Sequence, residues 1–191
     1  MLDKTLNIRG TLTSLATPLV MGILNITPDS FYAGSRKQTE TAIEDRIREI
    51  LSEGGDWIDI GGYSSRPDAA EVTPEEEMRR LEFALHILNK HYPDIPVSVD
   101  TFRAGIARRC VEEYGAAIIN DISGGELDAD MFQTVADLKV PYIMMHMRGT
   151  PQTRQRHTDY PDMMGSPSDM YLFFSKLVKT ISISNSLPLL S

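Results

Sequence analysis

The sequence contains a single cysteine, Cys110, among its 191 residues. One thiol excludes an internal disulfide and any metal site built from several cysteines, and it is typical of a protein in a reducing cytosol. Basic residues are also scarce: 19 Lys and Arg stand against 27 Asp and Glu, which gives a net charge of -8 and a pI near 5.0. Such a surface does not favour non-specific binding to nucleic acid, so an anionic ligand needs a local basic site.

Long apolar runs and several common motifs are missing as well. No stretch approaches the roughly 18 apolar residues of a membrane span, and residues 1–10 lack the apolar core of a signal peptide. We therefore expect a soluble, cytoplasmic protein. The sequence has no Gly-x-Gly-x-x-Gly turn, no Gly-x-x-x-x-Gly-Lys-Ser/Thr loop, no His-Glu-x-x-His and no Gly-x-Ser-x-Gly. These absences argue against nucleotide-binding doubly wound folds, and nothing indicates a covalent nucleophile or a structural zinc.

Five short, largely apolar runs that end in polar residues organise the chain. The runs are residues 21–24, 57–60, 97–99, 117–119 and 142–145, and they lead into Asn25, Gly61, Asp100, Asn120 and His146. Continuous apolar runs of this length are typical of strands that a parallel sheet buries on both faces. Because the carboxyl ends of parallel strands meet at one edge, we expect the polar residues to gather there.

Four helices are predicted between these runs. Their apolar faces are built from Ile43, Ile47, Ile50 and Leu51; from Met78, Leu81, Leu85 and Leu88; from Ile106, Cys110, Val111 and Tyr114; and from Met131, Val135 and Leu138. Gly54-Gly55 and Gly115 supply left-handed stops, and Thr73 with Glu76 forms a capping box. Asp128 is expected to cap the fourth helix.

The alternation of strands and helices predicts an α/β fold of the TIM (β/α)8-barrel class, with the site at the carboxyl ends of the strands. Residues 5–18 alternate apolar and polar side chains around Gly10, which predicts a β-hairpin that acts as a plug or lid. Five strand starts fall short of eight, so residues 1–160 are expected to form an incomplete barrel. Residues 162–191 contain seven serines and no glutamate. We therefore interpret 161–191 as an atypical tail, of the kind that truncation or a change of reading frame produces.

The polar residues at the strand ends suggest ligand chemistry, and each has a plainer alternative. Asn25 offers a neutral oxygen that suits a hard cation such as Mg²⁺, or it forms a loop with Thr27. Asp100 would be satisfied by a planar heterocycle with adjacent N–H and amino donors, or it caps the next helix. Asn120-Asp121 offers a further amide and carboxylate, or Asp121 forms the turn that follows. Arg66 suits an anion, or it is simply solvated.

These segments resemble dihydropteroate synthase, the pterin-binding TIM-barrel family of folate synthesis. The matching segments are residues 21–31, 59–67, 99–101, 119–125 and 145–149, in the order of the family. The resemblance implies that p-aminobenzoate condenses with 6-hydroxymethyl-7,8-dihydropterin diphosphate to give 7,8-dihydropteroate and diphosphate. It also implies Mg²⁺ as cofactor and competition by sulfonamides at the p-aminobenzoate site.

Site residues follow from the same resemblance. Asn25 would hold Mg²⁺ on the diphosphate. The substrate-binding residues would be Ser65, Arg66, Asp100, Asn120 and Met145, and the p-aminobenzoate loop would contain Thr27, Asp29, Ser30, Phe31 and Pro67. No catalytic residue is assigned, because an aniline nitrogen is already nucleophilic and the reaction needs mainly positioning and leaving-group stabilisation.

The second half of the family pattern has no counterpart between Tyr160 and Ser191. This leaves two alternatives open. One is a catalytically inactive half-barrel fragment, whose open strand edges would pair with another copy. The other is a pterin-dependent methyltransferase, which residues 27–31 and 65–67 disfavour. The expected partners are the two small-molecule substrates, with no nucleic acid and no membrane. A homodimer is usual in the family, but most of its surface is expected in the missing part.

Overall fold

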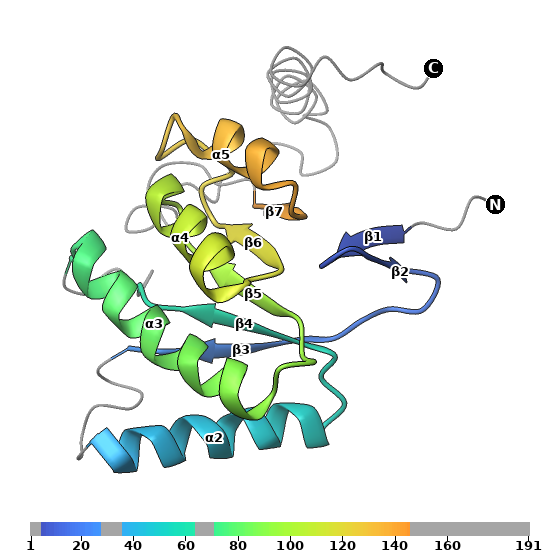
Figure 1. The fold of residues 1–191 in the computed structure, drawn as a ribbon, viewed down its shortest axis with the longest axis vertical. Coiled ribbons are helices and arrows are strands. Elements are labelled where there is room, and N and C mark those ends of the chain that lie inside the picture. Colours follow the sequence, from blue (N-terminus) through green and yellow to red (C-terminus); the bar gives the residue numbers. More distant parts are fainter. Residues whose placement is uncertain (1–4, 28–35, 64–70, 146–191) are drawn as a thin grey trace, which may run out of the picture.

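The computed structural model describes residues 5–27, 36–63 and 71–145 (Figure 1). In chain order the elements are β1 (Thr5–Ile8), β2 (Thr11–Ser14), β3 (Met21–Asn25), α2 (Arg36–Ser52), β4 (Trp57–Gly61), α3 (Pro74–His91), β5 (Val97–Asp100), α4 (Ala104–Tyr114), β6 (Ile118–Asp121), α5 (Met131–Leu138) and β7 (Tyr142–Met144). Within these ranges no helix is long and apolar enough to cross a membrane. Several predictions fall outside them: Asp29, Ser30, Phe31, Ser65, Arg66, Pro67, His146 and the tail 161–191.

The five predicted strands form one parallel sheet. Its order is β3-β4-β5-β6-β7, so every strand pairs with the next one along the chain. A doubly wound sheet reverses its strand order part-way, whereas a barrel adds strands in sequence. The order therefore agrees with the predicted barrel class, and the described residues supply five of its strands.

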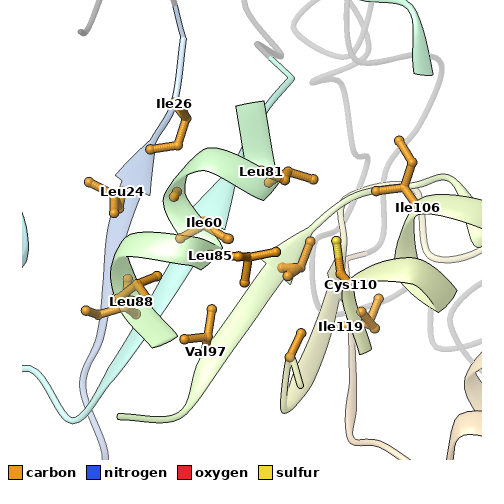
Figure 2. Close-up of a cluster of buried hydrophobic side chains, with 14 of the residues drawn as sticks. Leu24, Ile26, Ile60, Leu81, Leu85, Leu88, Val97, Ile106, Cys110 and Ile119 are labelled. Carbon is orange, nitrogen blue, oxygen red and sulfur yellow. The ribbon is translucent and has the colours of Figure 1, made fainter. Parts of the chain in front are cut away.

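The main core lies between the sheet and the helices, which wrap one face of it (Figure 1). Leu24 and Ile60 project from β3 and β4 toward Leu81 and Leu85 of α3 (Figure 2), and Val99 of β5 belongs to the same buried cluster. Each of these side chains is at most 1% exposed. Burying one such side chain contributes roughly 1.5–3 kcal/mol, so this layer holds the strands in their register.

Most helix ends follow the sequence prediction. The backbone N–H of Glu76 donates to Thr73 Oγ1 at 3.3 Å, and Gly54 and Gly115 take positive φ angles of 93° and 69° at the predicted stops. The capping box is only half formed among the described contacts. The carboxylate of Glu76 binds Arg79 and Arg80 of its own helix instead of returning to the cap.

The prediction that Asp128 caps α5 is wrong. The N-cap of α5 is Asp130, which makes no side-chain cap hydrogen bond. Asp128 Oδ2 accepts from the backbone N–H of Ala104, the first residue of α4, at 2.7 Å, and its Oδ1 accepts from the backbone N–H of Asp130, in the turn before α5, at 3.0 Å. Helix α4 has no side-chain cap of its own at Arg103. A carboxylate from a neighbouring loop therefore supplies the negative group that the positive end of α4 favours.

The N-terminal hairpin closes the opposite end of the sheet from the polar strand ends. Its strands β1 and β2 are antiparallel, and Ile8 packs with Trp57 and Ile118 in a second small core. Arg9 donates to the carbonyl oxygens of Pro93 and Gly115, at 3.0 and 3.1 Å, which precede β5 and β6. Of the two predicted roles, plug or lid, the structure supports a plug at the amino ends of the strands.

Gly62 and Gly105 provide a matched test of the packing between α3 and the end of β4. A Cβ at Gly62 would lie 2.9 Å from the carbonyl oxygen of Glu77, whereas a Cβ at Gly105 would meet nothing within 4 Å. We expect Gly62→Ala to lower the free energy of unfolding by about 1–3 kcal/mol and Gly105→Ala to leave it equal or slightly raised. Urea unfolding of both variants checks this, and a Gly62→Ala protein as stable as wild type would contradict it.

Candidate functional site

A row of residues joins the carboxyl ends of four strands. In the register of the sheet Asn25 pairs with Gly61, Gly61 with Asp100, and Asp100 with Asn120. Register partners in a parallel sheet project to the same face, so these four residues share one side. We call them the strand-end row. Their face is the one opposite the helices, because the alternating residues Leu24, Ile60 and Val99 point into the helix-covered core.

Gly61 carries no side chain, so side-chain oxygens of the two neighbouring strands come together beside its backbone at the centre of the strand-end row. The position that a Cβ at Gly61 would take lies 3.3 Å from Asn25 Oδ1 and 3.6 Å from Asp100 Oδ2. Two oxygen atoms from neighbouring strands thus border the same space. Asn25 is exposed, whereas Asp100 and Asn120 are half-buried. The row therefore offers oxygen acceptors to a flat ligand or a hard cation lying against the Gly61 backbone.

The two remaining described site candidates lie at the edges of the row. Thr27 is buried just after β3, where the backbone N–H of Ile26 donates to the carbonyl oxygen of Gly61 at 2.7 Å. Met145 is half-buried after β7, and its N–H donates to the carbonyl oxygen of Asp121 at 3.1 Å. These contacts continue the parallel pairing beyond the strands.

Asp121 faces away from the row and forms the turn, as its plainer interpretation predicted. Its Oδ1 accepts from the backbone N–H and the hydroxyl of Ser123, and its Oδ2 accepts from Gly125 N and from Tyr142 Oη. Burial, together with this carboxylate, raises the pKa of the Tyr142 hydroxyl. Asp121 therefore organises the loop after β6, and Asn120 is the residue of that strand end that shares the face of the strand-end row.

One layer below the row lies a buried carboxyl group, that of Asp59. It is 4% exposed, and its Oδ2 accepts from Asn120 Nδ2 at 3.0 Å. Asp59 Oδ1 and the hydroxyl of its register partner Ser98 are buried without a hydrogen bond in the structure. Burial raises the pKa of Asp59, and the neighbouring Ser98 and Asn120 oppose that shift.

A buried ion pair holds the loops that surround the strand ends. Glu77 of α3 is fully buried, accepts from Thr101 Oγ1 at 2.7 Å and pairs with Arg103, which also donates to the carbonyl oxygen of Val72 at 2.8 Å. Burial raises the pKa of Glu77, and Thr101 and Arg103 oppose the shift. The pair ties the start of α3 to the end of β5, directly beside Asp100.

An aromatic group covers this ion pair. The rings of Tyr63 and Phe102 meet edge to face, with centroids 5.1 Å apart, and the Arg103 guanidinium lies 5.5 and 4.8 Å from the two centroids. Tyr63 is the last described residue before the loop that contains Ser65 and Arg66. The edge-to-face rings therefore join the end of β4 to the end of β5.

Comparisons with known proteins agree with this geometry. The family model described as pterin binding enzyme matches residues 21–181. The chain belongs to this family. The dihydropteroate synthase of Synechocystis sp. is 42% identical over 159 residues, which cover 83% of this chain and 53% of that protein. The family membership that the strand-end segments predicted is thus confirmed.

Solved structures of synthases share the fold of this family member. The dihydropteroate synthase of Yersinia pestis, solved with a sulfonamide drug complex, matches with a TM-score of 0.79 and 33% identity over 95% of this chain and 64% of that chain. The Xanthomonas albilineans synthase was solved with 4-aminobenzoic acid (TM-score 0.74, 33% identity, 95% and 62% covered) and with 7,8-dihydropteroate (0.72, 30%, 95% and 61%). The chain thus spans less than two thirds of these proteins, and about half of the Synechocystis relative.

Sequence reasoning gave no role to two buried acids of this pterin-binding enzyme, Asp59 and Glu77. For Asp59 a signal existed, because it is the only charged residue in the run Trp57–Ile60. For Glu77 there was none, since an acidic residue in the first turn of a helix is ordinary. Only the fold shows that α3 turns Glu77 inward against Arg103.

Removing Arg103 tests the buried pair. In Arg103→Met the charge of Glu77 loses its partner, and we expect the free energy of unfolding to fall by about 3–5 kcal/mol near neutral pH. The pKa of Glu77 is already raised above 4.5 and would rise further. Because the unfolded chain ionises this carboxyl near pH 4.5, the loss should grow as the pH rises above that value and shrink at pH 5.

Urea unfolding at pH 5 and pH 8 measures this dependence. The control is Arg109→Met, which removes an exposed guanidinium paired with Glu113 and should change stability little at either pH. If Arg103→Met lowered the free energy of unfolding by the same amount at both pH values, Arg103 would not be the partner that keeps Glu77 ionised.

Proposed function

We propose that this chain acts as a dihydropteroate synthase, condensing 6-hydroxymethyl-7,8-dihydropterin diphosphate with p-aminobenzoate. One observation carries the proposal: Asn25, Asp100 and Asn120 share a single row, in which the side-chain oxygens of Asn25 and Asp100 meet beside Gly61. Three unrelated surface residues would not fall in consecutive register on one face. The synthase complexes with 4-aminobenzoic acid and 7,8-dihydropteroate support the same ligand classes. The relatives above are synthases, which weighs against the methyltransferase alternative.

The pterin binds through the acceptors of the row. The Asp100 carboxylate accepts from adjacent N–H and amino groups of the pterin ring, as carboxylates accept from paired donors elsewhere. Asn120 adds a carboxamide one strand away, and Met145 lies at the edge where β7 ends. Gly61 allows the ring to approach the backbone, because no side chain stands between Asn25 and Asp100.

The donor set fits Mg²⁺. Asn25 Oδ1 is an exposed neutral oxygen beside a carboxylate oxygen, and Mg²⁺ prefers one or two such protein oxygens with phosphate oxygens and water. The guanidinium groups of Arg80 and Arg103 are already paired with Glu76 and Glu77 respectively, so a bound cation is the simpler source of positive charge for the diphosphate. When bound, the ion would neutralise charge on the departing diphosphate. Asn25 therefore holds Mg²⁺ in this proposal, as the sequence resemblance implied.

The reaction requires positioning more than proton transfer. The amine nitrogen of p-aminobenzoate forms a bond to the methylene carbon of the pterin while the carbon–oxygen bond to diphosphate breaks, and the amine proton is released. Asp100 and Asn120 hold the ring so that the methylene carbon faces the amine. Thr27, Asp29, Ser30, Phe31, Ser65, Arg66 and Pro67 form the p-aminobenzoate site in this proposal, and sulfonamides compete there. A cytoplasmic location belongs to the same proposal.

An inactive half-barrel is the second candidate. β3 and β7 are the outer strands of the described sheet, and Ile23 of β3 is 57% exposed. An open sheet of this kind favours association between copies. Size-exclusion chromatography together with diphosphate release separates the candidates: a soluble species that turns over p-aminobenzoate excludes the inactive fragment.

Asp100→Asn tests the pterin contact. The change replaces a charged acceptor by a neutral amide of the same shape, and we expect pterin diphosphate to bind about 10- to 100-fold more weakly, with 7,8-dihydropteroate formation reduced in parallel. Calorimetry and a product assay measure the two effects. Asp137→Asn, an exposed carboxylate on α5, is the matched control and should match wild type. Equal affinity in Asp100→Asn and wild type would refute the proposed site.

Asn25→Ala tests the metal contact. We expect the Mg²⁺ concentration for half-maximal turnover to rise at least about 10-fold, because one protein ligand is lost. Pterin without its diphosphate should bind as in wild type, since Asp100 and Asn120 are unchanged. Removal of Mg²⁺ with EDTA should abolish turnover, and re-addition should restore it. A variant with an unaltered Mg²⁺ dependence would show that Asn25 does not hold the ion.

A further inference from the structure

Asp59 lies where a carboxyl group is unfavourable. Its register neighbours across the sheet are Ile23, Ser98 and, through Ser98, Ile118, so it sits in a largely apolar layer below the strand-end row. The side chain is 4% exposed, and among the described residues its Oδ1 makes no hydrogen bond of ordinary geometry, although the Ser98 hydroxyl is its neighbour. A buried acceptor without a partner destabilises a fold, and an apolar side chain of similar size avoids that loss. Stability alone therefore does not explain a carboxyl group here.

The hydrogen bond from Asn120 links Asp59 to the strand-end row. Asp59 is on β4 and Asn120 is on β6, so the contact from Asn120 Nδ2 to Asp59 Oδ2, at 3.0 Å, crosses over β5. The residue of β5 beneath it is Ser98, which is small and fully buried. A larger side chain at that position would separate the two groups. The small side chain of Ser98 therefore leaves room for Asp59 and Asn120 to make contact over β5.

The contact determines how Asn120 meets a ligand. A carboxamide has a donor end and an acceptor end of nearly equal shape, and either end can face a binding site. An ionised carboxylate only accepts hydrogen bonds, so Asp59 binds the amide nitrogen and turns Asn120 Oδ1 away from itself. Asn120 is half-buried and stands beside Asp100 in the row. Fixing the orientation of this amide therefore determines that its oxygen, and not its nitrogen, is presented beside the Asp100 carboxylate.

We propose that Asp59 is a positioning residue for the pterin site, which holds the Asn120 carboxamide in the orientation that binds the ring. The proposal rests on the proposed function, because it assumes that Asn120 contacts the pterin. Asp59 itself touches no reacting atom and acts only through Asn120.

Two substitutions of Asp59 separate this role from a general structural one. Asp59→Leu removes the acceptor in a similar volume, whereas Asp59→Asn keeps an oxygen that can accept from Asn120. Calorimetry with Mg²⁺ and pterin diphosphate, without p-aminobenzoate, avoids turnover. We expect Asp59→Leu to bind at least about 10-fold more weakly with an equal or higher melting temperature, and Asp59→Asn to stay within about threefold of wild type.

A double-mutant cycle and a matched control complete the binding test. In an Asn120→Ala background, Asp59→Leu should change affinity by less than about threefold, because the group it positions is gone. Ile58→Val alters the same strand on the helix-covered face and should leave affinity unchanged. Unchanged affinity in Asp59→Leu, an equal loss in the Asn120→Ala background, or equal losses in Asp59→Leu and Asp59→Asn would each overturn the proposal.

A readout without ligand separates the failure of this inference from failure of the proposed function. If the wild-type chain binds no pterin, the proposed function fails, whereas the contact can still be observed by NMR. We expect the side-chain amide protons of Asn120, identified by their loss in Asn120→Ala, to be protected from hydrogen exchange in wild type and Asp59→Asn. That protection should disappear in Asp59→Leu, and its persistence there would show that Asp59 does not hold Asn120.

Discussion

Parallel register around a glycine is the constraint on which the candidate site depends. Asn25, Asp100 and Asn120 share a face only because each strand pairs with its neighbour without a slip, and a shift by one residue would turn a strand's whole set to the other face. Gly61, which has no side chain, then lets Asn25 Oδ1 and Asp100 Oδ2 meet beside the backbone of β4. The apolar residues that alternate with the row, among them Leu24 and Val99, hold that register by their burial under the helices. The core and the site are therefore two faces of one sheet.

The two ends of the sheet differ in a way that suits this arrangement. At the amino ends the hairpin packs Ile8 into a small apolar cluster, and Arg9 binds two loop carbonyl oxygens. At the carboxyl ends, by contrast, carboxylates, amides and an ion pair accumulate. Barrels of this class place stability at one end and ligand chemistry at the other. The described part of this chain follows that division, although it contains five strands.

Two buried acidic groups near the strand ends, Glu77 and Asp59, hold neighbouring groups in place instead of adding to the apolar core. The pair of Glu77 and Arg103 joins α3, β5 and the start of α4, and Asp59 carries an oxygen without a partner below the row. Well-packed apolar side chains often fill such buried space with equal or greater stability. Both hold side chains or loops at the edge that carries Asp100 and Asn120. A site that must hold polar groups in one geometry needs such supporting contacts behind it.

The sequence by itself determined the elements, because the signals for them are local. Apolar runs marked β3 to β7, helical spacing marked α2 to α5, and Gly54, Gly115 and Thr73 marked ends that the structure confirms. The family resemblance of the strand-end segments was likewise readable without a structure.

Tertiary structure alone decided the contacts between residues far apart in the chain. Asp128 reaches the first residue of α4, Asp121 turns toward its loop, and Asp59 reaches Asn120 across β5. Spacing along a chain shows which residues share a strand or a helix face. It does not show which side chains meet across a sheet, because that depends on register, on the size of the residue between them and on where each helix packs.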